Sequence, residues 1–205
     1  TNLITYSQAY SGGNFMSNWT GNMFNNWINS TVTTGQIAPD GTATADLLTG
    51  YYARYSQTIS VTANTTYTFS CWLKNSGLVN PILLGIATGL NGTVVSAPAV
   101  TTSVAIASIG NWARYSVSYT IPASGVNQIQ CGVDFGASKS ASATGYSVYA
   151  WGAQCETGSY STPYIPSVGS SGSRSSTQAI VDLSSNKNVV TASSLSLIHI
   201  SEPTR

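Results

Sequence analysis

The sequence predicts an all-β domain with the architecture of a jelly-roll β-sandwich. Several short segments alternate apolar and polar residues with a period of two, and they are rich in β-branched and aromatic residues. Turns that contain Gly, Asn or Pro separate these segments, and no stretch has an apolar stripe of helical period. Short strands at such regular spacing are typical of sandwiches and jelly rolls.

Five segments carry the alternation, and each is predicted to be a strand. They are YARYSQTISV (52–61), TTYTFSCWLK (65–74), WARYSVSYTI (112–121), VNQIQCGVDF (126–135) and YSVYAWGAQC (146–155). Alternate residues of a strand share one face of a sheet. The residues predicted to face the core are Tyr67, Phe69, Cys71 and Leu73 on the second segment and Tyr115, Val117 and Tyr119 on the third.

The composition changes near Ser167, which predicts a domain boundary. Residues 1–168 form the predicted jelly-roll domain, and residues 169–178 are rich in Gly and Ser, as flexible linkers are. Residues 179–194 are too short to bury a core, so we interpret them as the truncated start of a second domain. The sequence opens at Thr1 without a signal-peptide pattern, and we expect this to be a cut within a longer protein.

The last eleven residues, LSLIHISEPTR (195–205), resemble a sequencing adapter translated in frame. We interpret them as a cloning or assembly scar of the kind that short environmental or genomic reads produce, and expect them to make no integrated core packing. They contain His199, the only histidine, which is therefore not a functional residue.

Charge is scarce, since Asp, Glu, Lys and Arg make up 6% of the residues and the formal net charge is +1. A typical soluble domain has roughly 25% charged residues. Without a basic run, nucleic-acid binding is not expected. The apolar stretches are shorter than the ~20 residues that span a membrane, so membrane insertion is not expected either.

The sequence predicts that the protein is not an enzyme. Without His199 no histidine remains as a base or metal ligand. Glycoside hydrolysis needs two carboxylates across one sugar. Asp134 and Glu156 could supply such a pair, but their local sequences do not single them out.

No cofactor is expected to be required, although a structural calcium ion is one alternative. Asp40 lies in APDGTATAD, where Pro39, Asp40 and Gly41 favour a β-turn. In the alternative interpretation, Asp40 or Asp46 joins backbone carbonyls in a calcium site, which needs several hard oxygen ligands.

The three cysteines, Cys71, Cys131 and Cys155, form no CxxC pair, which argues against a zinc site. The simplest interpretation of Cys71 is a small buried apolar residue. A Cys131–Cys155 disulfide is the alternative for the other two.

Aromatic residues on the outer sheet face are the predicted carbohydrate-binding residues. Opposite the core residues of segment 65–74 lie Ser70, Trp72 and Lys74, and segment 112–121 similarly places Trp112, Arg114 and Ser116 outside. The GYYARY stretch adds Tyr51, Tyr52 and Tyr55. Aromatic faces stack on the apolar faces of sugar rings, while cations bond the hydroxyls. Alternatively, these rings pack under loops or against a neighbouring subunit.

The order of motifs resembles a family of bacteriophage virion domains found in tail-fibre, head-fibre and other appendage proteins. These domains are similar to jelly-roll carbohydrate-binding modules. The resemblance covers roughly residues 2–168, and its most specific part is WGAQ-E-GS---T-YIP. This part comprises Trp151 to Gln154, Glu156, Gly158, Ser159, Thr162 and Tyr164 to Pro166. The downstream IVDLSSNKNVV resembles the opening of a concanavalin-like, laminin-G-type domain.

The resemblance implies a non-catalytic jelly roll on the virion exterior, with host-surface glycans and other virion subunits as partners and homo-oligomeric display in the full protein. Cys71 and Cys155 stand where the family pattern has an aliphatic residue, which implies reduced, buried thiols. Two other hypotheses stay open: a purely structural virion domain that mediates subunit contacts, and a carbohydrate-binding module of a secreted polysaccharide-degrading enzyme.

Overall fold

The computed structural model describes residues 1–8, 20–23, 31–50, 53–76, 82–90, 100–106, 110–135, 146–174, 181–182 and 189–190. Two compact units divide the chain, Thr1–Gly172 and Ser173–Arg205. The strands are β1 (Thr20–Met23), β2 (Thr31–Gln36), β3 (Ala45–Gly50), β4 (Ala53–Ser60), β5 (Thr66–Asn75), β6 (Ile82–Leu90), β7 (Val100–Ala105), β8 (Ala113–Thr120), β9 (Val126–Phe135), β10 (Tyr146–Thr157), β11 (Val181–Asp182) and β12 (Val189–Val190). Within these described ranges there is no helix, and hence none that could span a membrane.

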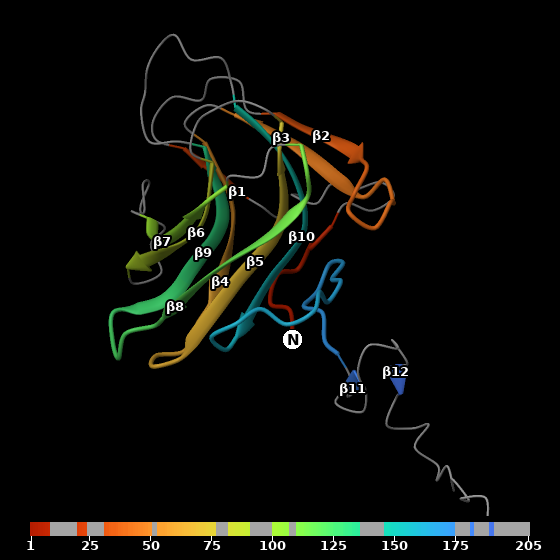
Figure 1. Ribbon diagram of the computed structural model, residues 1–205. Helices are drawn as coiled ribbons and strands as arrows, with labels where there is room; N and C mark the ends of the chain where they lie inside the picture. Colours follow the sequence, from red (N-terminus) through yellow and green to blue (C-terminus); the bar gives the residue numbers. More distant parts are fainter. Residues whose placement is uncertain are drawn as a thin grey trace, which may run out of the picture. The chain divides into compact units, whose positions relative to one another are not determined.

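The first unit is a sandwich of two five-stranded antiparallel sheets, which confirms the predicted fold class (Figure 1). One sheet has the order β1-β4-β9-β6-β7, and the other has the order β2-β3-β10-β5-β8. The five predicted segments correspond to β4, β5, β8, β9 and β10. In the second unit, β11 and β12 pair as a short two-stranded sheet. The predicted linker, truncated domain and adapter-derived tail stay predictions, and residues 195–205 lie outside the described residues.

The hydrophobic core lies between the two sheets and is built from alternate residues of their strands. Phe69 and Leu73 of β5 and Phe135 of β9 are fully buried there. The predicted core faces are confirmed, because Tyr67, Cys71 and Val117 are also buried and Tyr115 and Tyr119 pack against the same cluster. Burial of such large apolar side chains is the main stabilising contribution to a sandwich of this kind.

A β-bulge at Gly152 changes which residues of β10 face the core. The pairing of β10 with β5 shifts between Trp151 and Gln154, and Gly152 has a φ of 66°. Before the bulge Val148 and Ala150 belong to the core, and after it Ala153 and Cys155 do. One extra residue in a strand reverses its alternation in this way. The bulge therefore places Trp151 and Gln154 on the outer face of the same strand.

The N-terminal segment is fixed to the end of the first unit. Asn2 and Gly172 form an antiparallel bridge, and Tyr6 and Val168 form a second one. The fully buried side chain of Asn2 donates from Nδ2 to the carbonyl oxygens of Ala153 (3.0 Å) and Ile165 (2.9 Å). These contacts join the N-terminal segment to β10 and to the residues that follow it.

Candidate functional site

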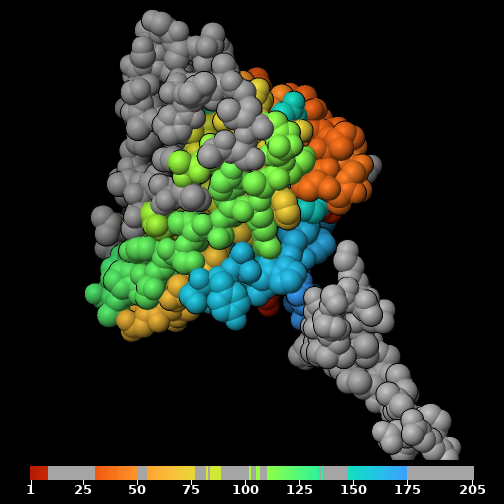
Figure 2. Space-filling view, viewed as in Figure 1, coloured from red at the N-terminus to blue at the C-terminus, as the bar shows by residue number. Residues whose placement is uncertain are grey.

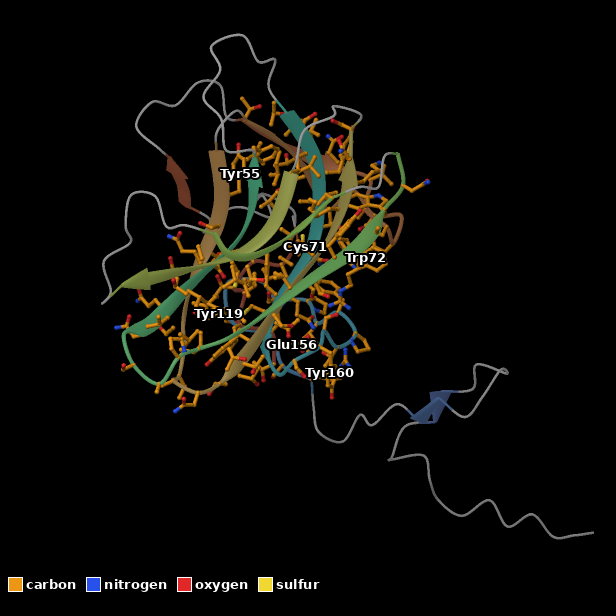
Figure 3. The ribbon with its side chains drawn as sticks, turned by 60° about the vertical axis from the view of Figure 1, so that its left-hand side comes forward. Tyr55, Cys71, Trp72, Tyr119, Glu156 and Tyr160 are labelled. Atoms are coloured by element: carbon orange, nitrogen blue, oxygen red, sulfur yellow. The ribbon has the colours of Figure 1, made fainter. Side chains whose placement is uncertain are left out.

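The strand register brings the predicted outer residues of β5 and β8 together on the outer face of the second sheet. Trp72 pairs with Arg114 of β8 on one side and with Trp151 of β10 on the other. Lys74 pairs with Tyr149 of β10. Trp72 is labelled on this sheet in Figure 3. Sequence reasoning missed Tyr149, although its position between the apolar Val148 and Ala150 could have assigned it to this face.

Four half-buried residues form what we call the aromatic patch: Trp72, Lys74, Trp112 and Tyr149. The Nζ atom of Lys74 lies 4.3 Å from the ring centroid of Tyr149 and 5.3 Å from that of Trp112. The rings of Trp112 and Tyr149 meet edge to face, with 6.4 Å between their centroids. Cation–π contacts of this kind hold an ammonium group over aromatic faces. The patch thus combines aromatic surface with one positive charge.

Hydroxyl groups adjoin the aromatic patch along the neighbouring strands. Tyr149 pairs with Leu47 of β3, and Leu47 pairs with Thr33 of β2. One step along the sheet, Ser147 pairs with Thr49, and Thr49 pairs with Thr31. These are residues that can donate hydrogen bonds to, and accept them from, a polyhydroxylated ligand.

The other half of this outer face is crossed by residues 158–166, which we call the strap. Figure 2 shows this blue segment lying against the green surface of β8. The Ser118 hydroxyl donates to the Ser159 carbonyl (3.2 Å), and the Arg114 guanidinium donates from Nη1 to the Thr162 carbonyl (2.7 Å). The strap consequently covers the outer face beside the aromatic patch.

Glu156 fixes the strap from the end of β10 (Figure 3). Its carboxylate accepts hydrogen bonds from the backbone N–H of Thr162 (2.7 Å), the Thr162 hydroxyl (2.7 Å) and Nε2 of Gln154 (2.8 Å). Gln154 in turn accepts from the backbone N–H of Ile165 (2.7 Å). The polar residues of the WGAQ-E motif therefore serve as the anchor of the strap.

Arg114 belongs to this anchor as well as to the outer face. Besides its bond to the strap, it donates from Nη2 to the Ser70 hydroxyl (2.9 Å). Burial lowers the pKa of the Arg114 guanidinium, while the charge of Glu156 opposes that shift. Two of its nitrogens are thus engaged within the chain, and a role of Arg114 in sugar binding stays a prediction.

Trp151 packs under the strap. Its ring lies 4.7 Å from that of Tyr164, and its Nε1 donates to the Thr44 hydroxyl (2.9 Å). Trp72 packs against the same cluster and lies beside the bulge at Gly152. Burial raises the pKa of the Tyr164 hydroxyl well above its ordinary value, although its hydrogen bond with Ser7 opposes the shift.

The assignment of Tyr55 to the outer face was wrong, because the structure places it in the core. Tyr55 is 7% exposed, packs edge to face on Phe135, and donates from its hydroxyl to the carbonyls of Thr31 (3.2 Å) and Thr49 (2.9 Å). The alternation of β4 points Tyr55 and Ile59 inward together. Tyr51 and Tyr52 lie outside the described residues.

The acidic residues lie in separate surroundings. Asp40 is exposed, and its Oδ1 accepts from the backbone N–H and the hydroxyl of Thr42, as in the turn interpretation. Asp46 is fully buried on β3. Among the described residues no group of three His, Cys, Asp or Glu side chains could hold a metal ion. The structural calcium site stays a prediction. Asp134 and Glu156 lie on different sheets, and His199 is outside the described residues.

The outer face of the first sheet carries a buried amide that sequence reasoning missed. Gln130 of β9 is 3% exposed, and among the described residues neither Nε2 nor Oε1 has a hydrogen-bond partner. The hydroxyl of Ser56 is buried too and has no hydrogen-bond partner in the part of the chain that the structure describes. Because Ile129 and Cys131 face the core, Gln130 faces away from it. Buried polar groups normally have hydrogen-bond partners, which makes Gln130 an exception among the described residues.

Solved structures of carbohydrate-binding modules share the fold of this sandwich. A family 16 carbohydrate-binding module (18% identity, TM-score 0.52) matches 76% of this chain and 99% of its own. The CBM22-2 xylan-binding domain of Paenibacillus barcinonensis Xyn10C (12% identity, TM-score 0.52) matches 75% and 96%. At such identities the likeness shows the fold alone.

A phage protein shares the same fold. The enzymatically active domain of tailspike protein 4 from bacteriophage CBA120 (16% identity, TM-score 0.51) matches 75% of this chain, which spans 22% of the tailspike chain. No protein-family model matches the chain, and no curated protein sequence matches it significantly.

Proposed function

We propose that this chain is a non-catalytic carbohydrate-binding domain whose sugar stacks on the aromatic patch. The observation that carries the proposal is the arrangement of Trp112 and Tyr149 around Lys74, next to a row of hydroxyl residues. Rings of this kind cover the apolar face of a pyranose, while Lys74 and the threonines bond its hydroxyls. The binding-module fold of the structural neighbours supports the proposal.

We further propose that the domain belongs to a phage virion appendage and binds host-surface glycans on the virion exterior. The motif order and the tailspike neighbour support this setting. A shallow patch of few residues binds a single sugar weakly. Homo-oligomeric display in the full protein would raise the avidity without new contacts.

If the chain binds carbohydrate, the outer face of the first sheet is a second location where the sugar could bind. The carboxamide of Gln130, which has no hydrogen-bond partner among the described residues, carries one acceptor and two donors, which match the hydroxyls of a saccharide. Gln130 and the aromatic patch lie on different sheets. Substitutions in each therefore separate the two locations.

Two other functions keep support from specific observations. Trp151 packs on Tyr164, and Trp72 packs against the same cluster, so these aromatics also fit a purely structural virion domain. The xylan-binding neighbour supports the alternative of a carbohydrate-binding module in a polysaccharide-degrading enzyme. A hydrolase domain encoded on the same chain would favour that alternative, and virion genes alongside would oppose it.

The experiment is a glycan-array and whole-cell binding screen with the full chain displayed multivalently. We expect binding to a defined sugar that Trp112→Ala and Tyr149→Ala each weaken at least about tenfold, which corresponds to ~1.4 kcal/mol. Tyr160→Ala, at an exposed residue of the strap, is the matched control and should bind normally. Loss in Gln130→Ala alone would move the site to the first sheet. If the folded protein binds no glycan and no cell of the panel, the carbohydrate proposal is overturned.

A further inference from the structure

Two cysteine sulfurs meet in the middle of the sandwich. Cys131 lies on β9 of the first sheet and Cys155 on β10 of the second, and both are fully buried. Their Sγ atoms are 3.6 Å apart, and one thiol donates to the other. Of the chain's cysteines only Cys71 is left over, and its thiol donates instead to the Trp151 carbonyl (3.4 Å).

We propose that Cys131 and Cys155 form an oxidative cross-linking site, which closes to a disulfide between the two sheets when the protein meets a disulfide-type oxidant such as oxidised glutathione. The two thiols lose their protons and two electrons and form one S–S bond. The oxidant's own S–S bond breaks, and the protons and electrons leave with two glutathione thiols. Atoms and electrons therefore balance without any further reactant.

The geometry requires only a small movement. A disulfide has its sulfurs ~2.05 Å apart, so the gap must close by about 1.5 Å, shared between the two side chains. Cys131 and Cys155 come from opposite sheets and their side chains meet across the core, so the two sulfurs can approach each other from both sides. Cys71 lies on the same sheet as Cys155 and bonds to backbone, so it has no such partner.

Burial makes thiol–disulfide exchange of this pair slow in the folded protein. Burial raises the pKa of the Cys131 thiol well above its ordinary value, and the neighbouring Cys155 thiol raises it further. The thiolate is the species that attacks a disulfide, so the folded protein exchanges slowly. The cross-link accordingly forms best while the chain folds in the oxidant, when the thiols are still accessible.

The test is to unfold the full chain and refold it either in a buffer of oxidised and reduced glutathione or in excess reductant. Free thiols are then counted by alkylation under denaturing conditions and mass spectrometry. We expect one alkylated cysteine, Cys71, in the oxidised sample and three in the reduced one. Peptide mapping should find Cys131 linked to Cys155 within a single chain.

Stability provides a second readout. The residues are 24 positions apart, and closing a loop of that length restricts the unfolded chain. We expect the oxidised protein to have a melting temperature higher by about 5 °C or more, with reductant reversing the gain. Cys71→Ala should keep the cross-link, whereas Cys155→Ala should abolish it. Three alkylated thiols after oxidative refolding, or a link that involves Cys71, would overturn the proposal. Because the number of alkylated thiols is measured in the wild type, this test holds even if a variant fails to fold.

Discussion

Asn2 and Cys155 are 153 positions apart, yet the side-chain oxygen of Asn2 accepts a hydrogen bond from the backbone N–H of Cys155 at 3.1 Å. The same oxygen accepts from the backbone N–H of Ile4, while Nδ2 donates to two carbonyls. The four hydrogen bonds occupy each donor and acceptor of the Asn2 amide that this buried site can satisfy. A residue near the N-terminus thus completes the hydrogen bonding of the last strand of the sandwich.

Asn2→Asp should therefore destabilise the protein strongly although it barely changes the side-chain shape. The new oxygen would face the carbonyls of Ala153 and Ile165, which need donors. We expect a loss of about 3 kcal/mol or more in the free energy of unfolding, measured by urea denaturation at pH 7. Asn64→Asp makes the same chemical change at an exposed turn and should stay within about 0.5 kcal/mol. Equal effects of the two variants would contradict this account.

Removal of the Glu156 carboxylate should release the strap. Glu156→Ala leaves the backbone N–H and hydroxyl of Thr162 without their acceptor, at an expected loss of about 3 kcal/mol. Limited proteolysis should then cut within residues 158–166 faster than in the wild type. Thr157→Ala changes the exposed neighbour and should leave the cleavage rate unchanged. An intact strap in Glu156→Ala would show that packing of Trp151 on Tyr164 suffices to hold it.

Gly132→Ala should cost much more than a substitution at a turn glycine. A Cβ at Gly132 would lie 2.5 Å from the Tyr55 carbonyl oxygen and 2.7 Å from the Ser56 Cβ, where β4 and β9 adjoin. We expect a loss of about 3 kcal/mol. At Gly125 an added Cβ meets nothing within 4 Å, and its φ of 84° costs about 1 kcal/mol. Thermal unfolding of both variants checks the difference, and a tolerated Gly132→Ala would mean that the strands can separate.

Stability should fall at alkaline pH because the folded protein keeps the Cys71 thiol protonated. Burial raises the pKa of Cys71 from its ordinary 9.0 to about 12, and its hydrogen bond to Trp151 and the charge of Arg114 only partly oppose this. The full contribution is present below pH 9, where both states are protonated. Between pH 9 and 12 only the unfolded state ionises, so stability falls by about 1 kcal/mol for each pH unit.

Urea unfolding of the wild type and Cys71→Ala between pH 8 and pH 11 measures this term. The variant has lost a buried thiol, so it should be less stable at pH 8 yet have a shallower decline above pH 9. If the free energy of unfolding declines equally with pH in the two proteins, other groups, such as Tyr164, cause the loss of stability at alkaline pH.

The strand alternation of the sequence was sufficient to predict the sandwich and the core faces of β5 and β8. It was applied wrongly at Tyr55, since Ile59 and Val61 have the same parity as Tyr55 and already indicate that this face of the strand points inward. The hydrogen bonds that anchor the strap could not be predicted from the sequence. They depend on the bulge at Gly152, which reverses the alternation, and on a segment that returns across the sheet without a regular pattern of its own. The outer position of Tyr149 was predictable from the alternation. The lack of hydrogen-bond partners for Gln130 among the described residues depends on its neighbours in space, which the sequence does not show.

The bridge between Asn2 and Gly172 sets how the first unit would respond to mechanical tension. Both residues lie side by side, and Asn2 donates from its backbone N–H to the Gly172 carbonyl (2.7 Å). A force applied through residues 1 and 172 would pull two antiparallel segments apart from one end. The bridge at Asn2 would open before the one between Tyr6 and Val168, each bond breaking in turn rather than together. The two terminal segments would therefore separate at low force, before the sheets themselves bear the load.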